Sequence, residues 1–219
     1  MEIDDTLFWI GHASFYIKAR NSTIFIDPFR VGSAVKEKAD LVLVTHAHFD
    51  HNSKEDIDKV SKGNTKYIGA AKCLEGYKMA AVSKPGFRTL FNGIKIEAVP
   101  AYNNREERLQ FHPKAENWVG YIIEIDGTRI YHAGDTDSIP EMAGLKDIDI
   151  ALLPMGGKYT MTMEEALGAE KAINAKSIVP MHYKMLLGEE GSRRLEKELK
   201  AKLDNVHIMR EVQAPIYSF

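Results

Sequence analysis

The sequence predicts an α/β protein with four layers, in which two β-sheets pack face to face and helices cover the outer faces. Short apolar or alternating segments typical of strands occur in both halves of the chain, and segments with helix signals follow them in each half. The apolar faces of such elements must be buried against one another, which favours a layered αββα sandwich. No repeat, low-complexity tract or linker divides the 219 residues, so one domain spanning residues 1–219 is expected.

Short apolar or alternating runs between turn residues indicate the strands of the first half. They are expected over 7–10, 13–19, 23–26, 41–45, 67–71 and 94–99. Ser53 is placed to cap a helix that runs to about Val60, and Asp56 stands near the position of a capping box. A further helix is expected over 74–81.

The second half repeats this alternation of strands and helices. Asp126-Gly127 is a strong hairpin signal between strands expected over 119–125 and 128–132. Thr162 and Glu165 have the spacing of a capping box, which opens a helix to about Asn174. The remaining strands are expected over 148–153, 177–181 and 206–209, and the remaining helix over 193–203.

Composition argues against several classes of protein. The 29 Lys and Arg side chains nearly balance the 31 Asp and Glu, so the net charge of −2 gives no basis for nucleic acid as a partner, and a small-molecule substrate is expected. No apolar run approaches the roughly 20 residues that a transmembrane helix needs. The first residues are acidic, where a secretory signal would be basic, so a cytoplasmic location is expected. The single Cys73 excludes an internal disulfide and a cysteine-based zinc cluster.

Three histidines and an aspartate directly after the apolar run 41–44 are the most informative feature of the chain. His46 and His48 share side-chain parity while the chain is extended, so both can face one metal ion. Asp50 and His51 follow on the turn beyond, within reach of a second ion. Neutral imidazole and carboxylate suit zinc, and also iron or manganese. A lone histidine there would more often be a core residue, but this cluster predicts a metal site.

Further ligands are expected at other strand ends. Asp135 follows a strand after a glycine and could bridge two metal ions, although a turn aspartate would have the same sequence context. His182 follows the strand expected over 177–181. His112 lies in a loop next to a proline and is a weaker candidate, because Tyr102 and Asn103 stand closer to the strand end and compete for the same place.

Three more residues are candidates for supporting roles. Asp27, at the end of a strand, is well placed to accept the outer N–H of a ligating imidazole, which would orient the ring. A simple turn aspartate would explain it nearly as well. His12 and His132 could contact the substrate or support a ligand, or could be buried and satisfied by a backbone carbonyl.

With these residues assembled, the chain resembles the metallo-β-lactamase superfamily of metal-dependent hydrolases. The segment 46–51 is similar to its signature motif, Asp135 to its bridging aspartate and His182 to its late histidine. These elements cover nearly the whole chain. The resemblance implies the four-layer αββα metallo-β-lactamase fold, with the metal site at one edge of the two sheets.

Within this superfamily, the segments 11–15, 26–28 and 131–137 resemble a branch of small prokaryotic proteins. That branch is related to ascorbate-6-phosphate lactonase and, more distantly, to N-acyl phosphatidylethanolamine phospholipase D. One departure concerns the third histidine, which many members carry directly after a strand. Here residues 101–103 occupy that place, so His112 has to reach back from its loop.

The resemblance implies a hydrolase with two divalent metal ions, Zn²⁺ first and Mn²⁺ or Fe²⁺ as alternatives. A metal-bound hydroxide would attack an ester, lactone or phosphodiester, and Asp50 is the expected catalytic residue that orients it and takes its proton. One ion is assigned to His46, His48 and His112, and the other to Asp50, His51 and His182, with Asp135 between them. The expected candidates for binding the developing anion or protonating the leaving group are His12, Tyr102, Lys158 and Tyr159.

Other functions stay open on the sequence alone. A metal-binding sensor or binding protein without turnover would use the same ligands. A di-iron redox protein of the same superfamily would hand electrons to a flavin domain, of which the sequence has no sign. A nuclease is disfavoured by the missing basic surface. The oligomeric state is not predicted, and a homo-oligomer remains open.

Overall fold

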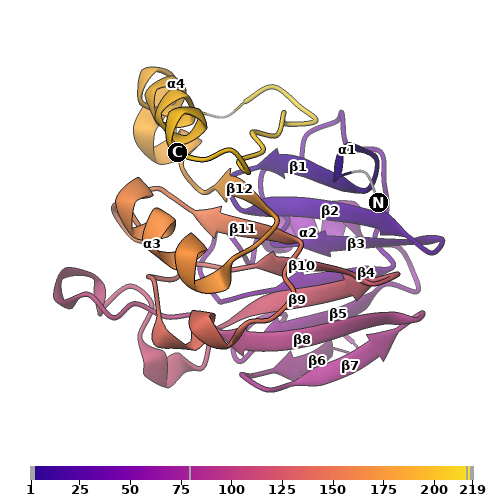
Figure 1. The fold of residues 1–219 in the computed structure, drawn as a ribbon. Coiled ribbons are helices and arrows are strands. Elements are labelled where there is room, and N and C mark those ends of the chain that lie inside the picture. The colour runs from indigo at the N-terminus through magenta and orange to yellow at the C-terminus, as the bar shows by residue number, and fades with distance from the viewer. Residues whose placement is uncertain (1–2, 79, 216, 218–219) are drawn as a thin grey trace.

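Two mixed six-stranded sheets face each other in the computed structural model, which describes residues 3–78, 80–215 and 217 (Figure 1). The strands of the first sheet follow the chain: β1 (Leu7–Gly11), β2 (Ser14–Ala19), β3 (Ser22–Ile26), β4 (Leu41–Val44), β5 (Lys66–Ala70) and β6 (Ala80–Ser83). The second sheet has the spatial order β12 (Ser177–Met181), β11 (Ile150–Pro154), β10 (Thr128–His132), β9 (Val119–Ile125), β8 (Ile94–Pro100) and β7 (Arg88–Phe91).

Helices flank the paired sheets, which confirms the predicted four-layer arrangement. Figure 1 shows α2 (Lys54–Val60) behind the first sheet and α3 (Met163–Ile173) in front of the second. The other helical elements are α1 (Ile3–Thr6), α4 (Lys184–Lys202) and short 3₁₀ turns at Glu106–Arg108, Lys114–Glu116 and Pro140–Gly144. Within the described residues, none of the helices combines the length and apolar character needed to cross a membrane.

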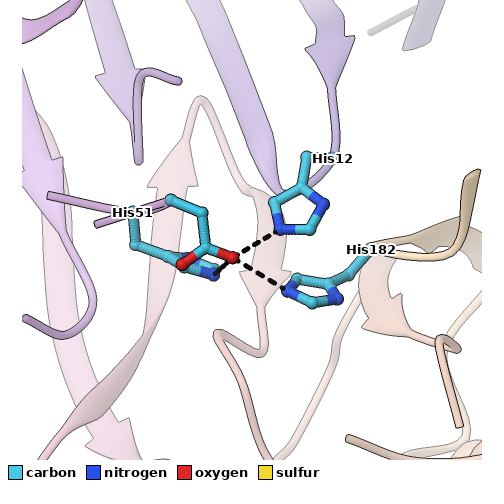
Figure 2. A group of neighbouring side chains, drawn as sticks. His12, His51 and His182 are labelled. Atoms are coloured by element: carbon cyan, nitrogen blue, oxygen red, sulfur yellow. Dashed lines mark hydrogen bonds and ion pairs between the residues drawn. The ribbon is translucent and has the colours of Figure 1, made fainter. Parts of the chain in front are cut away.

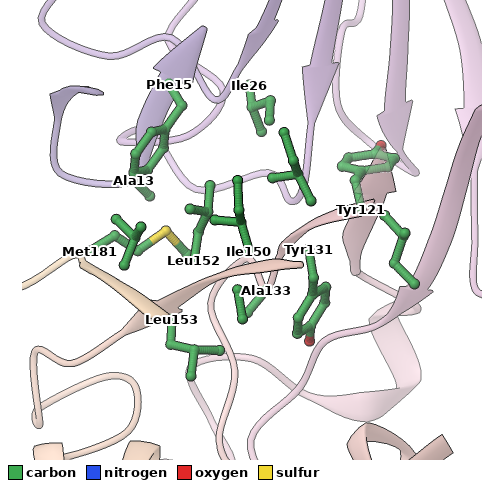
Figure 3. Close-up of a cluster of buried hydrophobic side chains, with 14 of the residues drawn as sticks. Ala13, Phe15, Ile26, Tyr121, Tyr131, Ala133, Ile150, Leu152, Leu153 and Met181 are labelled. Atoms are coloured by element: carbon green, nitrogen blue, oxygen red, sulfur yellow. The ribbon is translucent and has the colours of Figure 1, made fainter. Parts of the chain in front are cut away.

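Alternation along the strands explains how the layers pack. In β4, Leu41 and Leu43 face the core between the sheets, whereas Val42 and Val44 face the cluster that includes Ile57 of α2. Successive side chains of a strand point to opposite faces, so a strand buried on both faces reads as a continuous apolar run. Full burial of each such side chain contributes about 1.5–3 kcal/mol. Figure 3 shows the core between the sheets, where side chains of both gather.

Parallel pairing brings several strand ends to one edge of the molecule. β3 pairs with β4 in parallel, and β10, β11 and β12 are parallel to one another. The carboxyl ends of parallel strands lie at the same edge of a sheet. Residues that follow β4, β10 and β12 therefore start from the same end of their sheets, and these segments carry the candidate ligands.

The predicted local signals at α3 and at the β9–β10 turn are confirmed, and the one at α2 is confirmed in part. The Thr162 side chain accepts a hydrogen bond from the Glu165 amide, and the Glu165 carboxylate accepts one from the Thr162 amide, so the capping box of α3 is complete. Ser53 caps α2, but the carboxylate of Asp56 accepts from two amides of the 30–31 segment and does not close a capping box. Asp126 and Gly127 form the β9–β10 turn with φ values of 50° and 83°.

The helix predicted over 74–81 was wrong. Leu74 has a φ of 58°, which takes the backbone off a helical path, and turns follow it. The strand β6 begins at Ala80 and pairs in parallel with β5, so pairing with a neighbouring strand outweighs the helical pattern. Residue 79 of this prediction lies outside the described residues. The strand β7, which pairs with β8, was not predicted.

Two predictions near the carboxyl end also need correction. The helix predicted over 193–203 is the second part of α4, which begins at Lys184 and contains a break at Gly188, where φ is 67°. The strand predicted over 206–209 is reduced to one isolated bridge between Val206 and Ile178. Two backbone hydrogen bonds join this part of the chain to Ile178 of β12, but the pairing does not extend into a ladder.

Candidate metal centre

The first group of candidate ligands combines the end of β4 with a distant loop. His46 Nε2 lies 3.1 Å from His48 Nδ1, as expected for two nitrogens that face one point. Ligand atoms of His46, His48 and His112 all lie within 4.8 Å of one another. The other ring nitrogen of His46, Nδ1, lies 3.0 Å from the hydroxyl oxygen of Thr45, which holds the ring in its orientation. The structure thus brings together three imidazoles that are up to 66 residues apart in the sequence numbering.

A second group surrounds the carboxylate of Asp50. Its Oδ2 lies 2.9 Å from His12 Nε2, 3.9 Å from His182 Nε2 and 4.0 Å from His51 Nε2. Figure 2 shows that the three rings converge on one carboxylate from separate segments of the chain. His12, from the β1–β2 turn, therefore lies as close to this group as the residues of the predicted ligand set.

Asp135 lies between the two groups. Its Oδ2 is 3.3 Å from His112 Nε2 and 3.1 Å from His182 Nε2, and its Oδ1 is 3.5 Å from His51 Nε2. One carboxylate thus faces imidazoles of both groups, which is the arrangement that a bridging ligand requires. The preceding Gly134 has a φ of 64°, and a Cβ there would lie 2.8 Å from the carbonyl oxygen of Val119. Only glycine fits this close approach of the two backbones.

Asp27 holds two residues of the ligand segment in place through hydrogen bonds. Its Oδ2 lies 2.7 Å from His51 Nδ1, so Nε2 of the same ring is turned toward the ligand groups. The carboxylate also accepts hydrogen bonds from the Thr45 amide at 2.8 Å and the Thr45 hydroxyl at 2.6 Å. Asp27 is fully buried, and this bonding matches the role predicted for it.

Three residues of the centre have a left-handed backbone conformation. His12, Asp27 and His182 have φ values of 53°, 46° and 58°, in the left-handed region that few residues other than glycine adopt. Such conformations cost about 1–3 kcal/mol each and persist where the surroundings impose them. The His182 amide donates to the carbonyl of His12 at 3.0 Å, which ties two of the three positions together.

The loop that carries His112 is held in place at two points, Asn103 and Arg108. Asn103 Oδ1 lies 2.7 Å from His112 Nδ1. The Asn103 amide therefore does not take the place of His112 as a ligand but orients its ring, with Nε2 toward Asp135. Arg108 is buried in the same loop and pairs with Asp137 at 3.0 Å and with Glu165 at 2.6 Å. These contacts explain how a histidine far from the strand end reaches the centre.

Other side chains named from the sequence lie elsewhere or serve the fold. The Tyr102 hydroxyl donates to Glu141 at 2.8 Å and accepts from Lys114 at 3.0 Å, and Tyr102 does not line the cavity described below, contrary to expectation. Its side chain faces away because this charged pair satisfies its hydroxyl. His132 is buried, and its Nε2 donates to the carbonyl of Ala13 at 2.8 Å, which links the two sheets.

Burial keeps several imidazoles of the centre neutral. It lowers the pKa of His12 to about 4, and neighbouring His182 adds to the effect. Burial likewise lowers the pKa of His46 well below its ordinary value and lowers that of His48. A neutral imidazole has the free lone pair that a metal ion binds, so these histidines are in the form suited to ligation.

Carboxylates around His51 have the opposite effect and favour its protonated form. Burial opposes a charge on this ring, but Asp135, Asp27 and Asp50 together raise the pKa of His51 well above its ordinary value. Burial also opposes ionisation of Asp135, yet neighbouring imidazoles lower its pKa well below the usual range. Ionised carboxylates in a buried site require positive charge close by, which a proton or a metal cation can supply.

Unpartnered polar atoms test whether the residues fit a metal ion. Among the described residues, the buried atoms without a hydrogen-bond partner include Nε2 of His51, His112 and His182 and Oδ1 of Asp135. Each of these atoms lies among the other ligand atoms. Buried polar groups are nearly always satisfied, so four unsatisfied atoms directed at one region fit divalent cations between them.

A cavity of about 410 Å³ opens over these ligands. Its lining contains the candidate ligands His48, Asp50, His112, Asp135 and His182, together with Phe49, Phe111 and Tyr159. Tyr159 was a predicted candidate, whereas Phe49 and Phe111 were not identified from the sequence. A cavity of similar size over β7–β10 is lined by both charged and uncharged side chains and contains none of the candidate ligands.

Trp118 also packs against the centre and was not identified from the sequence. Its ring centroid lies 5.0 Å from that of His46, 4.9 Å from that of His48 and 5.8 Å from that of His112. The indole therefore forms the apolar back wall of the first ligand group, which excludes water and restricts the rings. A tryptophan directly before a buried strand is ordinary core sequence, so its position carried no signal.

Comparison with known proteins adds independent information. A family model described as a beta-lactamase superfamily domain matches residues 6–182. A UPF0173 metal-dependent hydrolase from Thermococcus onnurineus is 37% identical over 193 residues, which cover 80% of this chain and 83% of that protein. Another from Thermoplasma volcanium is 32% identical over 228 residues and covers 98% of this chain and 99% of its own.

Solved structures agree with these sequence matches. A crystal structure from Parabacteroides distasonis, of a protein assigned as a metal-dependent hydrolase, superposes with a TM-score of 0.83 at 38% identity and covers 94% of this chain and 93% of that one. A metallo hydrolase from the hyperthermophilic archaeon Ignicoccus hospitalis gives a TM-score of 0.72 at 28% identity, with 94% of each chain covered. These matches confirm the metallo-β-lactamase fold expected from the sequence.

Proposed function

Because the chain belongs to the metallo-β-lactamase superfamily, and within it to the UPF0173 metal-dependent hydrolases, we propose that it hydrolyses a small-molecule substrate at a centre for two divalent metal ions. His46, His48 and His112 would hold one ion, and Asp50, His51 and His182 the other, with Asp135 between them. The observation that carries this proposal is the position of Asp135, whose carboxylate lies within 3.5 Å of imidazoles from both groups. Zn²⁺ suits this set of nitrogen and oxygen ligands best, and Mn²⁺ and Fe²⁺ are the alternatives.

The chemistry assigned to the ions follows from their charge. When bound, two divalent cations would lower the pKa of a bound water molecule and would polarise the scissile carbonyl or phosphoryl oxygen. The family's hydrolytic character, together with this chemistry, supports an ester, lactone or phosphodiester as the substrate.

The protein's own groups would orient the reaction. Burial opposes ionisation of Asp50, but the charge of His51 and the hydrogen bond from His12 lower its pKa below the usual range. Asp50 therefore stays ionised at neutral pH and can accept a hydrogen bond from the attacking water. His12 Nε2 holds the same carboxylate from the opposite side, so we assign His12 the role of positioning Asp50.

Further features of the sequence support finer parts of this function. The segments 11–15, 26–28 and 131–137 support a relation to the branch of ascorbate-6-phosphate lactonase and N-acyl phosphatidylethanolamine phospholipase D. The near-neutral net charge supports a small molecule over nucleic acid as the substrate. The single cysteine agrees with a reducing, cytoplasmic location, and the absence of any linker agrees with one domain.

Substitution of ligands tests the proposal. His48→Ala and Asp135→Asn should each reduce bound metal, measured by elemental analysis of the purified protein, and should reduce turnover of a panel of esters, lactones and phosphodiesters at least about 100-fold. His207→Ala is the matched control, because His207 lies outside both ligand groups and should change neither quantity. Unchanged metal content and turnover in both ligand variants would contradict the proposal, and metal without turnover in the unmodified protein would favour a binding protein instead.

A further inference from the structure

The walls of the cavity over the metal centre have one chemical character. Apart from the five candidate ligands, the lining residues are Phe49, Phe111 and Tyr159, all of them aromatic. They come from three separate segments, namely the turn after β4, the loop between β8 and β9, and the loop after β11. A substrate that reaches the metal ions with its reacting bond must place the neighbouring part of the molecule against these rings.

Two of the three rings contact each other, and the third is exposed to solvent. Phe111 and Tyr159 meet edge to face, with ring centroids 4.9 Å apart and an interplanar angle of 85°. Phe49 is 68% exposed and meets Phe29 edge to face, with ring centroids 5.9 Å apart. An exposed phenylalanine beside a catalytic cavity costs solvation and is typical of a surface that becomes covered when a ligand binds.

Groups that recognise a charged substrate are missing from the same walls. None of the described residues that line the cavity is a lysine or an arginine. The nearby Lys158 lies over the ring of Tyr159, 4.9 Å from its centroid, outside the lining, and Arg108 is committed to Asp137 and Glu165. A phosphate or carboxylate remote from the metal ions would therefore lose water without gaining a charged partner, which is unfavourable.

We propose that the substrate carries an uncharged aromatic or apolar group next to its scissile bond and that Phe49, Phe111 and Tyr159 bind this group. The inference rests on the hydrolytic function proposed above and narrows it to esters, lactones or phosphodiesters that carry an apolar group beside the scissile bond, in preference to phosphorylated sugars. The volume of about 410 Å³ lies in the range of small-molecule sites and admits one ring with a short linker.

Hydroxamates test this proposal without any turnover, because each binds a divalent cation through the same two oxygen atoms. Calorimetry on the zinc-loaded full chain would compare acetohydroxamate, benzohydroxamate and succinate monohydroxamate, which differ only in the group beside the chelating atoms. Benzohydroxamate should bind at least about tenfold more tightly than acetohydroxamate, since ring stacking and apolar burial act together. Succinate monohydroxamate should bind no more tightly than acetohydroxamate.

Variants separate the aromatic walls from the ligands. Phe111→Ala should reduce the preference for benzohydroxamate to about threefold or less, with the affinity for acetohydroxamate unchanged. Leu109→Ala is the matched control, since Leu109 is an exposed apolar residue of the same loop outside the cavity lining and should leave the preference intact. Tyr159→Ala provides a second variant on a different loop, should the first disturb the position of His112.

The possible outcomes distinguish the two proposals. Equal affinity for the three hydroxamates, or tightest binding of succinate monohydroxamate, would overturn the inference and leave the hydrolytic function standing. A preference for benzohydroxamate that survives both Phe111→Ala and Tyr159→Ala would also overturn it. If the protein retains no metal and binds no hydroxamate, the hydrolytic function fails, and this inference fails with it.

Discussion

At the scale of single residues, the centre depends on groups that never face the substrate. Asp27 gives one oxygen to the amide of Thr45 and the other to both the Thr45 hydroxyl and His51. It therefore fixes the start of the ligand segment and the orientation of a ring within it. Asn103 does the same for His112. Outer hydrogen bonds of this kind determine which nitrogen faces the metal and how basic it is.

Replacement of Asp27 should expose this dependence. Asp27→Asn keeps the size of the side chain but leaves one acceptor oxygen in place of two, so His51 loses its fixed orientation. We expect about 10–100-fold weaker metal binding, measured by competition with a chromogenic chelator. Asp40→Asn is a matched control, because Asp40, next to the start of β4, also accepts a backbone hydrogen bond, from Thr23, but lies outside the ligand groups. Equal metal affinity in the two variants would contradict this role for Asp27.

At the scale of elements, short connections after strands place the ligands. His182 stands directly after β12, and the loop after β11 crosses it closely. A Cβ at Gly156 would lie 2.5 Å from the carbonyl oxygen of His182 and 2.3 Å from a methyl carbon of Leu186. The two connections can therefore approach only because this position has no side chain.

Gly156→Ala should push the His182 segment away from Asp135. We expect metal affinity to fall by at least about tenfold, together with a loss of about 1–3 kcal/mol in the free energy of unfolding, the usual cost of an overpacked site. Gly168→Ala is the matched control, because Gly168 lies within α3 and a Cβ there meets nothing within 4 Å. That variant should gain about 0.5–1 kcal/mol through helix propensity and bind metal normally. Chemical denaturation and chelator competition measure both effects, and wild-type affinity in Gly156→Ala would refute the steric argument.

At the scale of the whole molecule, the metal centre joins the two sheets. His46, Asp50 and His51 follow β4 of the first sheet, whereas Asp135 and His182 follow strands of the second. Bound cations would therefore link the two sheets at one edge, in addition to the apolar core between them. The carboxylates gathered there repel one another when no positive charge is present.

Metal removal should consequently weaken the fold without abolishing it. Free metal at about a thousandfold excess over the dissociation constant stabilises the native state by about 4 kcal/mol, which corresponds to roughly 10 °C in Tm for a chain of this size. Thermal unfolding with and without EDTA measures this difference. His48→Ala should show a clearly smaller difference, because it has lost a ligand. The same Tm in both conditions for the unmodified protein would show that the centre does not contribute to stability.

Much of the architecture could be read from local patterns. The alternating or apolar runs of β1–β5 and β8–β12, the hairpin at Asp126-Gly127 and the capping box of α3 depend on neighbours within a few residues. The segment 74–81 shows the limit of such reading. Its composition suits a helix, but β5 offers an open edge for pairing, and that edge is formed by residues earlier in the chain.

The sequence by itself determined most of the strands, β1–β5 and β8–β12, and the identity of the residues available to bind metal, because strand patterns and the ligand motif depend on runs of neighbouring residues. Only the tertiary structure decided which of these residues meet. The packing of the two sheets places His12 and Asp135 at the same edge. Contacts of Arg108 and Asn103 hold the loop that positions His112 at the centre. Tyr102 instead forms hydrogen bonds with Glu141 and Lys114, away from the cavity. The physical reason is that these contacts join segments far apart in the chain, where distance in space depends on sheet packing and loop path, which no local pattern encodes.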